Sequence, residues 1–409
     1  MDSDRTAIIV GASHAGCQLA FSLRQEGWEG RILLLGEEPA AAYNRPPLSK
    51  GYLLGDQQRS ELPIRTDDAY AKSRIEWQPT TRVVCIDAQA KQVVTDAGSV
   101  LAYDELALCT GARARTVQLP GIALGGVHTL RTLADVDAIR SGLPEVRQAV
   151  ILGGGYIGLE TAAALRKLGV EVTVLEMAPR VLARVTAPVV SAFYERVFHE
   201  EGVRIVTGAS VERIEGTDRV EAVLCTDGSR IPAQLVVVGV GVVPNVELAA
   251  EAGVRVDDGI VVDAFGRTSA PHVVAAGDCT RHPSLLYGMV RLESVPNAME
   301  QARAAAATLC GKLKPHEALP WFWSDQFDVK LQIAGLNCGH DQVVLRGDAE
   351  SGRRFSAFYL RVGRLIAADC VNRPADFIGS KKLIAAGVAV DARLLADEDI
   401  KLSTLLNPA

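Results

Sequence analysis

The feature that most constrains this chain is a short pattern that occurs twice. Residues 7–16 read AIIVGASHAG, and residues 149–158 read AVILGGGYIG. In each copy an apolar run leads into a glycine-rich turn, helix-forming residues and a second apolar run that ends near an acid. The acid is Glu37 or Glu38 in the first copy and Glu176 in the second. This order predicts two α/β units, each built to bind a dinucleotide.

Each residue type in the pattern has a physical task. Glycines let the backbone approach a pyrophosphate, which then lies at a helix N-terminus, and the acid forms hydrogen bonds with ribose hydroxyls. The first copy departs from the pattern, because Ser13 stands where the middle glycine is usual. The serine Cβ crowds the phosphate slightly, although its hydroxyl is able to donate a hydrogen bond. The alternative is a pair of tight strand–helix turns that bind no ligand.

Two such sites in one chain predict two different dinucleotides, most simply FAD and a nicotinamide nucleotide. A nicotinamide delivers a hydride, whereas a flavin accepts it and releases electrons singly. The 8 cysteines include no C-x-x-C pair, and the 7 histidines include no H-x-x-x-H pair. We therefore predict no metal site and no iron–sulfur cluster in this chain. Electron transfer then requires an organic cofactor or a partner protein.

Charge and hydropathy argue against other classes of protein. The 43 basic and 49 acidic residues give a net charge of −6, which argues against nucleic acid or an anionic membrane as the main partner. The sequence has no apolar run of the roughly 18 residues that span a bilayer. The N-terminal residues do not form a basic segment followed by an apolar one. We predict a cytoplasmic protein that does not contact a membrane.

The rest of the chain predicts further helices, a linker and a C-terminal part that is rich in strands. Helices are expected over residues 18–25 and 159–168, and an alanine-rich helix over residues 301–310. The Pro-Gly pair at residues 120–121 is typical of a linker. From Trp321 onward strand-like runs follow one another, which predicts a separate α+β domain at the C-terminal end.

Several segments outside the glycine turns are shared with a known superfamily. They are residues 44–50 (NRPPLSK), 109–112 (CTGA), 276–278 (AGD), 293–298 (ESVPNA) and 321–326 (WFWSDQ). Together with the two glycine turns, they resemble the two-dinucleotide flavoproteins that include glutathione reductase. Within that superfamily, the chain is most similar to the ferredoxin reductases of bacterial oxygenase systems. The resemblance covers essentially the whole chain.

The resemblance implies an α/β fold with two Rossmann-like dinucleotide-binding domains and a C-terminal α+β domain. It implies a discontinuous FAD-binding domain of residues 1–112 and 241–320. The NAD-binding domain, residues 113–240, is then inserted into it, and residues 321–409 form the C-terminal domain that completes the flavin site.

The resemblance also implies an activity and a partner. NADH would reduce FAD, and the flavin would pass single electrons to a separate 2Fe-2S ferredoxin. That ferredoxin would serve a haem-thiolate monooxygenase or a ring-hydroxylating dioxygenase of aromatic hydrocarbon catabolism.

Site residues are implied position by position. The expected FAD contacts are Gly11, Ser13, Ala15, Gly16, Glu37, Arg45, Lys50, Val83, Thr110, Gly111, Arg131, Gly277, Asp278, Val295 and Trp323. The expected NAD contacts are Gly153, Gly155, Tyr156, Ile157, Gly158, Glu176, Arg184 and Gly241. Glu176 favours NADH over NADPH, because a 2′-phosphate would meet a like charge, although Arg180 and Arg184 lie nearby and weaken that preference.

Four residues are implied in the electron transfer itself. Lys50 would lie beside flavin N5 and pair with Glu160, since a buried lone ammonium is costly and a cation stabilises a reduced flavin. Tyr156 would cover the nicotinamide side of the flavin, and Trp323 would lie on the side where electrons leave. From the residues alone, the alternatives are a surface lysine at Lys50, helix packing for Tyr156 and a core aromatic at Trp323.

Two other function classes remain open from the sequence. One is a flavin-dependent quinone, peroxide or disulfide reductase. The disulfide and peroxide branches carry a redox cysteine near the position of Lys50, whereas this chain has no cysteine between Cys17 and Cys85. The other class is a redox scaffold like the apoptosis-inducing factors. The net charge of −6 and the absence of a basic cluster argue against it.

Overall fold

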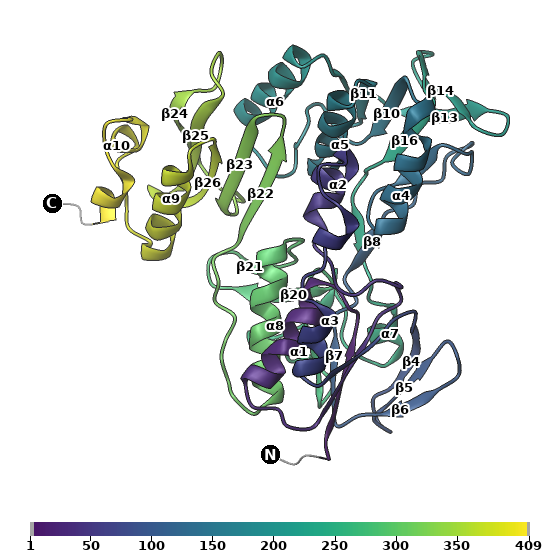
Figure 1. Cartoon of the computed structure of the whole chain (residues 1–409). Coiled ribbons are helices and arrows are strands. Elements are labelled where there is room, and N and C mark those ends of the chain that lie inside the picture. The colour runs from purple at the N-terminus through teal and green to yellow at the C-terminus, as the bar shows by residue number, and fades with distance from the viewer. Residues whose placement is uncertain (1–3, 407–409) are drawn as a thin grey trace. The chain divides into compact units, whose positions relative to one another are not determined.

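The computed structural model describes residues 4–406, which divide into two compact units (Figure 1). Unit 1 contains residues 1–44, 59–113 and 243–320, and unit 2 contains residues 45–58, 114–242 and 321–409. The first three residues of the expected FAD-binding domain and the last three of the expected C-terminal domain lie outside the described residues. The α/β fold class expected from the sequence is confirmed.

Unit 1 is built on a five-stranded sheet with the strand order β19-β7-β1-β2-β3. Every pairing in it is parallel, and β1 pairs residue by residue with β2 from Thr6–Arg31 to Val10–Leu35. Its strands are β1 (Thr6–Val10), β2 (Arg31–Leu35), β3 (Ile75–Gln78), β7 (Glu105–Leu108) and β19 (Val273–Ala275). Strands buried on both faces read as continuous apolar runs, as these do.

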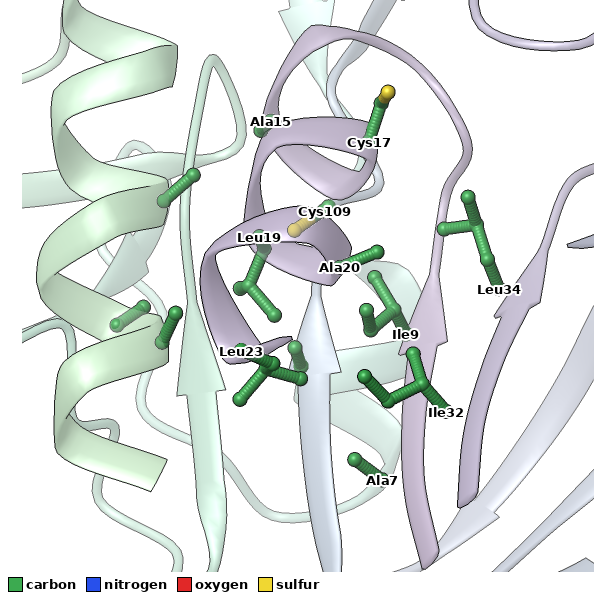
Figure 2. Close-up of a cluster of buried hydrophobic side chains, with 14 of the residues drawn as sticks. Ala7, Ile9, Ala15, Cys17, Leu19, Ala20, Leu23, Ile32, Leu34 and Cys109 are labelled. Atoms are coloured by element: carbon green, nitrogen blue, oxygen red, sulfur yellow. The ribbon is translucent and has the colours of Figure 1, made fainter. Parts of the chain in front are cut away.

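Helices α1 (His14–Gln25) and α8 (Val295–Leu309) pack on this sheet. Figure 2 shows Leu19 and Leu23 of α1 in the same buried cluster as Ile9 of β1. All three side chains are fully buried, and burial of each such side chain stabilises the unit by about 1.5–3 kcal/mol. The buried face of α8 is rich in alanine, which lets the two helices approach closely.

The other elements of unit 1 surround this core. An antiparallel sheet contains β4 (Val83–Asp87), β5 (Gln92–Thr95) and β6 (Val100–Ala102), and a second small sheet contains β18 (Ile260–Val261), β20 (Thr280–Ser284) and β21 (Gly288–Val290). The helices are η2 (Arg59–Glu61), α3 (Asp67–Lys72) and α7 (Glu247–Glu251). Strands β8 (Ala112–Ala114) and β17 (Val242–Pro244) mark two of the places where the chain passes from one unit to the other.

Unit 2 repeats the same parallel arrangement. Its first sheet has the order β12-β11-β10-β16-β9. The strands are β9 (Val127–Thr129), β10 (Gln148–Leu152), β11 (Glu171–Glu176), β12 (Arg204–Thr207) and β16 (Leu235–Val238). The helices are η1 (Pro46–Ser49), α2 (Gly51–Leu54), α4 (Leu133–Gly142), η3 (Leu143–Glu145), α5 (Tyr156–Lys167) and α6 (Pro188–Glu200). A three-stranded antiparallel sheet contains β13 (Val211–Gly216), β14 (Val220–Cys225) and β15 (Arg230–Pro232).

The C-terminal part of unit 2 is an antiparallel sheet followed by helices, as the sequence predicts. The strand order is β22-β23-β26-β25-β24. The strands are β22 (Trp321–Gln326), β23 (Val329–Gly335), β24 (Gln342–Asp348), β25 (Arg354–Arg361) and β26 (Arg364–Val371). The helices are α9 (Pro374–Ala386), α10 (Ala392–Ala396) and η4 (Leu402–Leu406).

Two sequence expectations need correction. Both nucleotide-site helices begin earlier than expected, at His14 and Tyr156, because each starts within its glycine turn, directly after the N-cap residue Ser13 or Gly155. The Pro-Gly pair at residues 120–121 is not a free linker. The Ile214 N–H donates to the Pro120 carbonyl at 2.8 Å, and a Cβ at Gly121 would lie 2.0 Å from the Ile214 carbonyl oxygen. This segment therefore packs against β13. Within residues 4–406, none of the helices combines the length and the apolar character needed to cross a membrane.

Candidate functional site

The second glycine turn, in unit 2, forms a cradle closed by backbone contacts. A Cβ at Gly153 would lie 2.5 Å from the Gly239 carbonyl oxygen, and a Cβ at Gly158 would lie 2.1 Å from the Gly153 carbonyl oxygen. Only glycine fits these two positions. Gly155 differs, because a Cβ there meets no other atom within 4 Å. It is the N-cap of α5, so the open space lies at a helix N-terminus, where a phosphate binds favourably.

Glu176 lies at the end of β11 and is held by this turn. Its Oε2 accepts the Gly154 N–H at 2.6 Å, and its Oε1 accepts the Ala178 N–H at 2.7 Å. The carboxylate is thus fixed at the end of the strand next to the cradle. That is where an acid binds the ribose of a dinucleotide.

The other residues expected to contact NAD lie in the same unit. Ile157 is 44% exposed in the first turn of α5. Arg184 is exposed in the segment between β11 and α6, and Gly241 is exposed with a φ of 99°. The Tyr156 ring stacks on Phe322 with centroids 4.7 Å apart. Its hydroxyl is buried without a hydrogen-bond partner in the described chain, and burial raises the Tyr156 pKa well above its usual value.

The first glycine turn, in unit 1, has the same construction. A Cβ at Gly11 would lie 2.2 Å from the Cys109 carbonyl oxygen, and a Cβ at Gly16 would lie 1.9 Å from the Gly11 carbonyl oxygen. Ser13 is the N-cap of α1, as Gly155 is the N-cap of α5. Because the equivalent position in unit 2 has room for a Cβ, the serine fits the pattern without closing the cradle. Both turns therefore fit a dinucleotide.

Predicted FAD contacts in unit 1 cluster at the carboxyl ends of its parallel strands. Thr110 and Gly111 follow β7, and the Thr110 hydroxyl donates to the Asn245 carbonyl at 2.6 Å. Gly277 and Asp278 follow β19, and the Gly277 N–H donates to Gln301 Oε1 at 2.7 Å. These ends lie beside the first glycine turn: a Cβ at Gly277 would lie 3.0 Å from the Cβ of Ala15.

The remaining predicted contacts in unit 1 differ in exposure. Val295 opens α8 directly after its N-cap, Ser294. Glu37 is 68% exposed and lies 3.9 Å from Arg82 Nε. Val83 is buried at the start of β4.

Arg45 and Arg131, both predicted to contact FAD, meet each other in unit 2. Arg45 Nη1 donates to the Arg131 carbonyl at 2.7 Å. The Arg131 N–H in turn donates to Asp135 Oδ2 at 2.9 Å, beside the capping box that begins α4. The two arginines are therefore joined through the backbone.

Lys50 and Glu160 form the ion pair that the resemblance implies. Lys50 Nζ lies 2.6 Å from Glu160 Oε2, with side chains that are 20% and 2% exposed respectively. Ser49 also donates to Oε2, at 2.5 Å, and Ser324 donates to Oε1 at 2.5 Å. A nearly buried carboxylate thus has a cation and two hydroxyl donors, so both of its oxygens have partners.

Sequence reasoning missed the groups that complete this centre. Ser324 lies in the same WFWSDQ segment as Trp323, but an isolated serine carries no signal of its partner. Trp323 is half-buried on β22, where it lines a hollow of about 530 Å³ with Trp321 and Asp325.

The sequence also contained no sign of Asp369, a fully buried acid that accepts the Tyr359 hydroxyl at 2.5 Å. Burial raises the Asp369 pKa to about 7, although that hydrogen bond opposes the shift.

Two family models match the chain, and the second begins where the strand-rich C-terminal part begins. A model described as pyridine nucleotide-disulphide oxidoreductase matches residues 5–302. The chain belongs to the pyridine nucleotide-disulphide oxidoreductase family. A second model, described as reductase C-terminal, matches residues 321–406. As a member of this family, the chain is an oxidoreductase that works with a pyridine nucleotide and a flavin.

Individual relatives of this oxidoreductase are similar over their whole lengths. Putidaredoxin reductase CamA of Pseudomonas putida is 46% identical, with 100% of this chain and 98% of the relative covered. The ferredoxin–NAD(+) reductase component of the biphenyl dioxygenase system of Paraburkholderia xenovorans (strain LB400) is 40% identical, with 98% of each covered. A chain in the crystal structure of the covalent putidaredoxin reductase–putidaredoxin complex has a TM-score of 0.95 and 45% identity, with 99% of each covered. The resemblance to ferredoxin reductases of oxygenase systems is confirmed.

Proposed function

We propose that this oxidoreductase takes electrons from NADH through FAD and passes them to a separate 2Fe-2S ferredoxin of an oxygenase system. The observation that carries the proposal is the presence of two complete glycine cradles, one in each unit, each at a helix N-terminus. The names of the relatives supply the acceptor, since they describe reductases of putidaredoxin and of a dioxygenase ferredoxin. The acceptor protein would serve a haem-thiolate monooxygenase or a ring-hydroxylating dioxygenase.

Unit 2 is proposed to hold NADH. Gly153, Gly155 and Gly158 would let the pyrophosphate approach the N-terminus of α5. Glu176 would accept hydrogen bonds from the adenosine ribose, and its negative charge would disfavour a 2′-phosphate. The bonds from Gly154 and Ala178 hold the carboxylate in place, so it needs no reorganisation when the nucleotide binds.

Unit 1 is proposed to hold the adenosine and pyrophosphate of FAD at Gly11, Ser13 and Gly16. Gly277 lies beside that turn and is followed by Asp278, and the Gly277 N–H donates to Gln301. When bound, FAD would accept a hydride and release electrons one at a time. The other flavin contacts taken from the resemblance stay a prediction.

Lys50 is proposed to provide the positive charge that stabilises a reduced flavin. Glu160 keeps the ammonium in place at 2.6 Å, and only 20% of the Lys50 side chain is exposed. Tyr156 and Trp323 keep their predicted roles, on the nicotinamide side and on the side where electrons leave. The domain bounds 1–112 with 241–320, 113–240 and 321–409 also stay a prediction. We propose a cytoplasmic location, because the NADH that supplies the electrons is produced there.

The test is an anaerobic titration of the purified protein with NADH, followed by absorbance. A flavin band that NADH bleaches, and that returns when an oxidised 2Fe-2S ferredoxin is added, is the expected result. FAD is identified by mass after acid release. Bleaching that only a quinone, peroxide or disulfide reverses would contradict the ferredoxin assignment. A protein without flavin would contradict the cofactor assignment.

A further inference from the structure

Strand β22 presents two different faces within unit 2. Side chains alternate along a strand, so Trp321, Trp323 and Asp325 lie on one face, where they line the hollow of about 530 Å³. Ser324 and Gln326, on the other face, are buried. The six residues of β22 therefore line the hollow with one face and place two polar side chains in the interior of unit 2 with the other.

The buried face of β22 meets one face of α5. Phe322 stacks on Tyr156, and the Ser324 hydroxyl donates to Glu160 Oε1 at 2.5 Å. Tyr156 and Glu160 are four residues apart, which places them on the same side of the helix. The C-terminal sheet thus contacts two of the four residues predicted to take part in electron transfer.

The hydrogen bonds at this contact have a defined direction. Gln326 Nε2 donates to the Ser324 oxygen at 2.7 Å, so the serine hydroxyl hydrogen is free to point toward Glu160 Oε1. Ser49 and Lys50 both act on the other oxygen, Oε2. Each carboxylate oxygen therefore has its own partners, and the carboxylate does not rotate without losing at least one of them.

We propose that Ser324 is a positioning residue for the Lys50–Glu160 ion pair. Its hydroxyl holds the Glu160 carboxylate in its orientation, and Gln326 orients the hydroxyl. Removal of one of the donors makes the buried negative charge less stable. The ammonium of Lys50 is then held less firmly in the pair, and its nitrogen becomes more accessible to an acylating reagent. The link to flavin chemistry rests on the proposed function, whereas the effect on Lys50 does not.

The test compares Ser324→Ala with wild type in the full chain as purified. Lys50 is acylated with acetic anhydride at neutral pH, and the rate is measured by mass spectrometry relative to the exposed Lys72 of the same chain. We expect acylation of Lys50 to be about three- to tenfold faster in Ser324→Ala, as befits the loss of one charge-assisted hydrogen bond. Glu160→Gln, which removes the charge itself, gives the upper reference.

Ser356→Ala is the matched control. Ser356 is fully buried in the same sheet and donates to the Asp376 carboxylate at 2.9 Å, which is paired with Arg373. The control removes the same kind of bond elsewhere and is expected to leave Lys50 acylation unchanged. Equal Lys50 rates in wild type, Ser324→Ala and Ser356→Ala would overturn the proposal.

A second readout concerns the flavin. In Ser324→Ala, the acid side of the pH profile for flavin bleaching by NADH is expected to move up by about one pH unit, and Ser324→Thr is expected to restore it. An unmoved profile would contradict the link to the flavin. If Ser324→Ala does not fold, Gln326→Leu replaces it, with a smaller change in the same direction expected in both readouts. Wild-type protein without flavin would refute the proposed function but leave the acylation comparison intact.

Discussion

Lys50 Nζ lies 2.6 Å from Glu160 Oε2, and the carboxylate of this pair is almost completely buried. Lys50 follows the short helix η1, whereas Glu160 lies in the second turn of α5. The pair is supported by donors from both sides, Ser49 and Ser324. A largely buried ion pair whose carboxylate oxygens both have hydrogen-bond donors keeps its charges in place, which suits a role at a redox cofactor.

Replacement of this cation tests its role directly. In Lys50→Met, we expect the rate of flavin reduction by NADH to fall about ten- to hundredfold, because a preorganised charge is lost. Stability is expected to fall by about 1–3 kcal/mol, since Glu160 keeps two hydroxyl donors. Stopped-flow absorbance and urea unfolding measure the two effects. Lys72→Met, at a lysine that is 80% exposed, is the control. A wild-type reduction rate in Lys50→Met would remove Lys50 from the mechanism.

Glu176 is expected to determine whether the protein prefers NADH or NADPH. In Glu176→Gln, we expect the preference for NADH over NADPH, as a ratio of kcat/KM values, to fall about tenfold, because a 2′-phosphate no longer meets a like charge. An amide has one acceptor oxygen, whereas the carboxylate accepts from Gly154 and from Ala178. Stability should therefore fall by about 1 kcal/mol. The control is Glu171→Gln, at an exposed acid on the same strand. An unchanged ratio would show that Glu176 does not approach the ribose.

Two glycines of the second turn are expected to respond in opposite ways. Gly155→Ser should change stability by less than about 0.5 kcal/mol, because the position is an extended N-cap with open space around it. It should raise the KM for NADH several-fold, since the side chain enters the cradle. Gly158→Ala should cost about 3 kcal/mol or more, because its Cβ would meet the Gly153 carbonyl. Thermal unfolding and steady-state kinetics distinguish the two. An unaltered KM in Gly155→Ser would contradict the crowding of the phosphate that we expect at this N-cap.

The raised pKa of Asp369 is expected to make the stability of the protein depend on pH. Burial raises its pKa to about 7, compared with 3.8 in an unfolded chain. The unfolded state therefore loses its proton first, and this group lowers the stability of the wild type progressively as the pH rises from about 4 to about 7. In Asp369→Asn, which keeps an acceptor for Tyr359, that loss is absent. The free energy of unfolding of Asp369→Asn, relative to that of wild type, should therefore rise by about 2–3 kcal/mol between pH 5 and pH 7.

Urea unfolding at the two pH values measures this difference. Asp56→Asn, at an exposed acid of the same unit, serves as the control and should follow the wild type. Parallel pH profiles for Asp369→Asn and wild type would show that Asp369 is not the titrating group.

The sequence by itself determined the parts of this protein that are local in the chain. The glycine turns, the apolar strands around them and the acids that follow depend on neighbouring residues, so both cradles and the α/β class were readable from it. Gly11 and Gly153 have positive φ values and close backbone contacts that other residues do not fit. The Lys50–Glu160 pair was predicted only through the resemblance, because nothing in the spacing of the two residues connects them.

Only the tertiary structure decided what completes the site. Ser324 reaches Glu160 from 164 residues away, and it does so because β22 packs on the face of α5 that carries Tyr156 and Glu160. Asp369 is likewise defined by its surroundings, since an aspartate in a strand has no unusual pKa until the fold removes it from water. Such contacts depend on which surfaces meet after folding, and short-range sequence patterns contain no record of them.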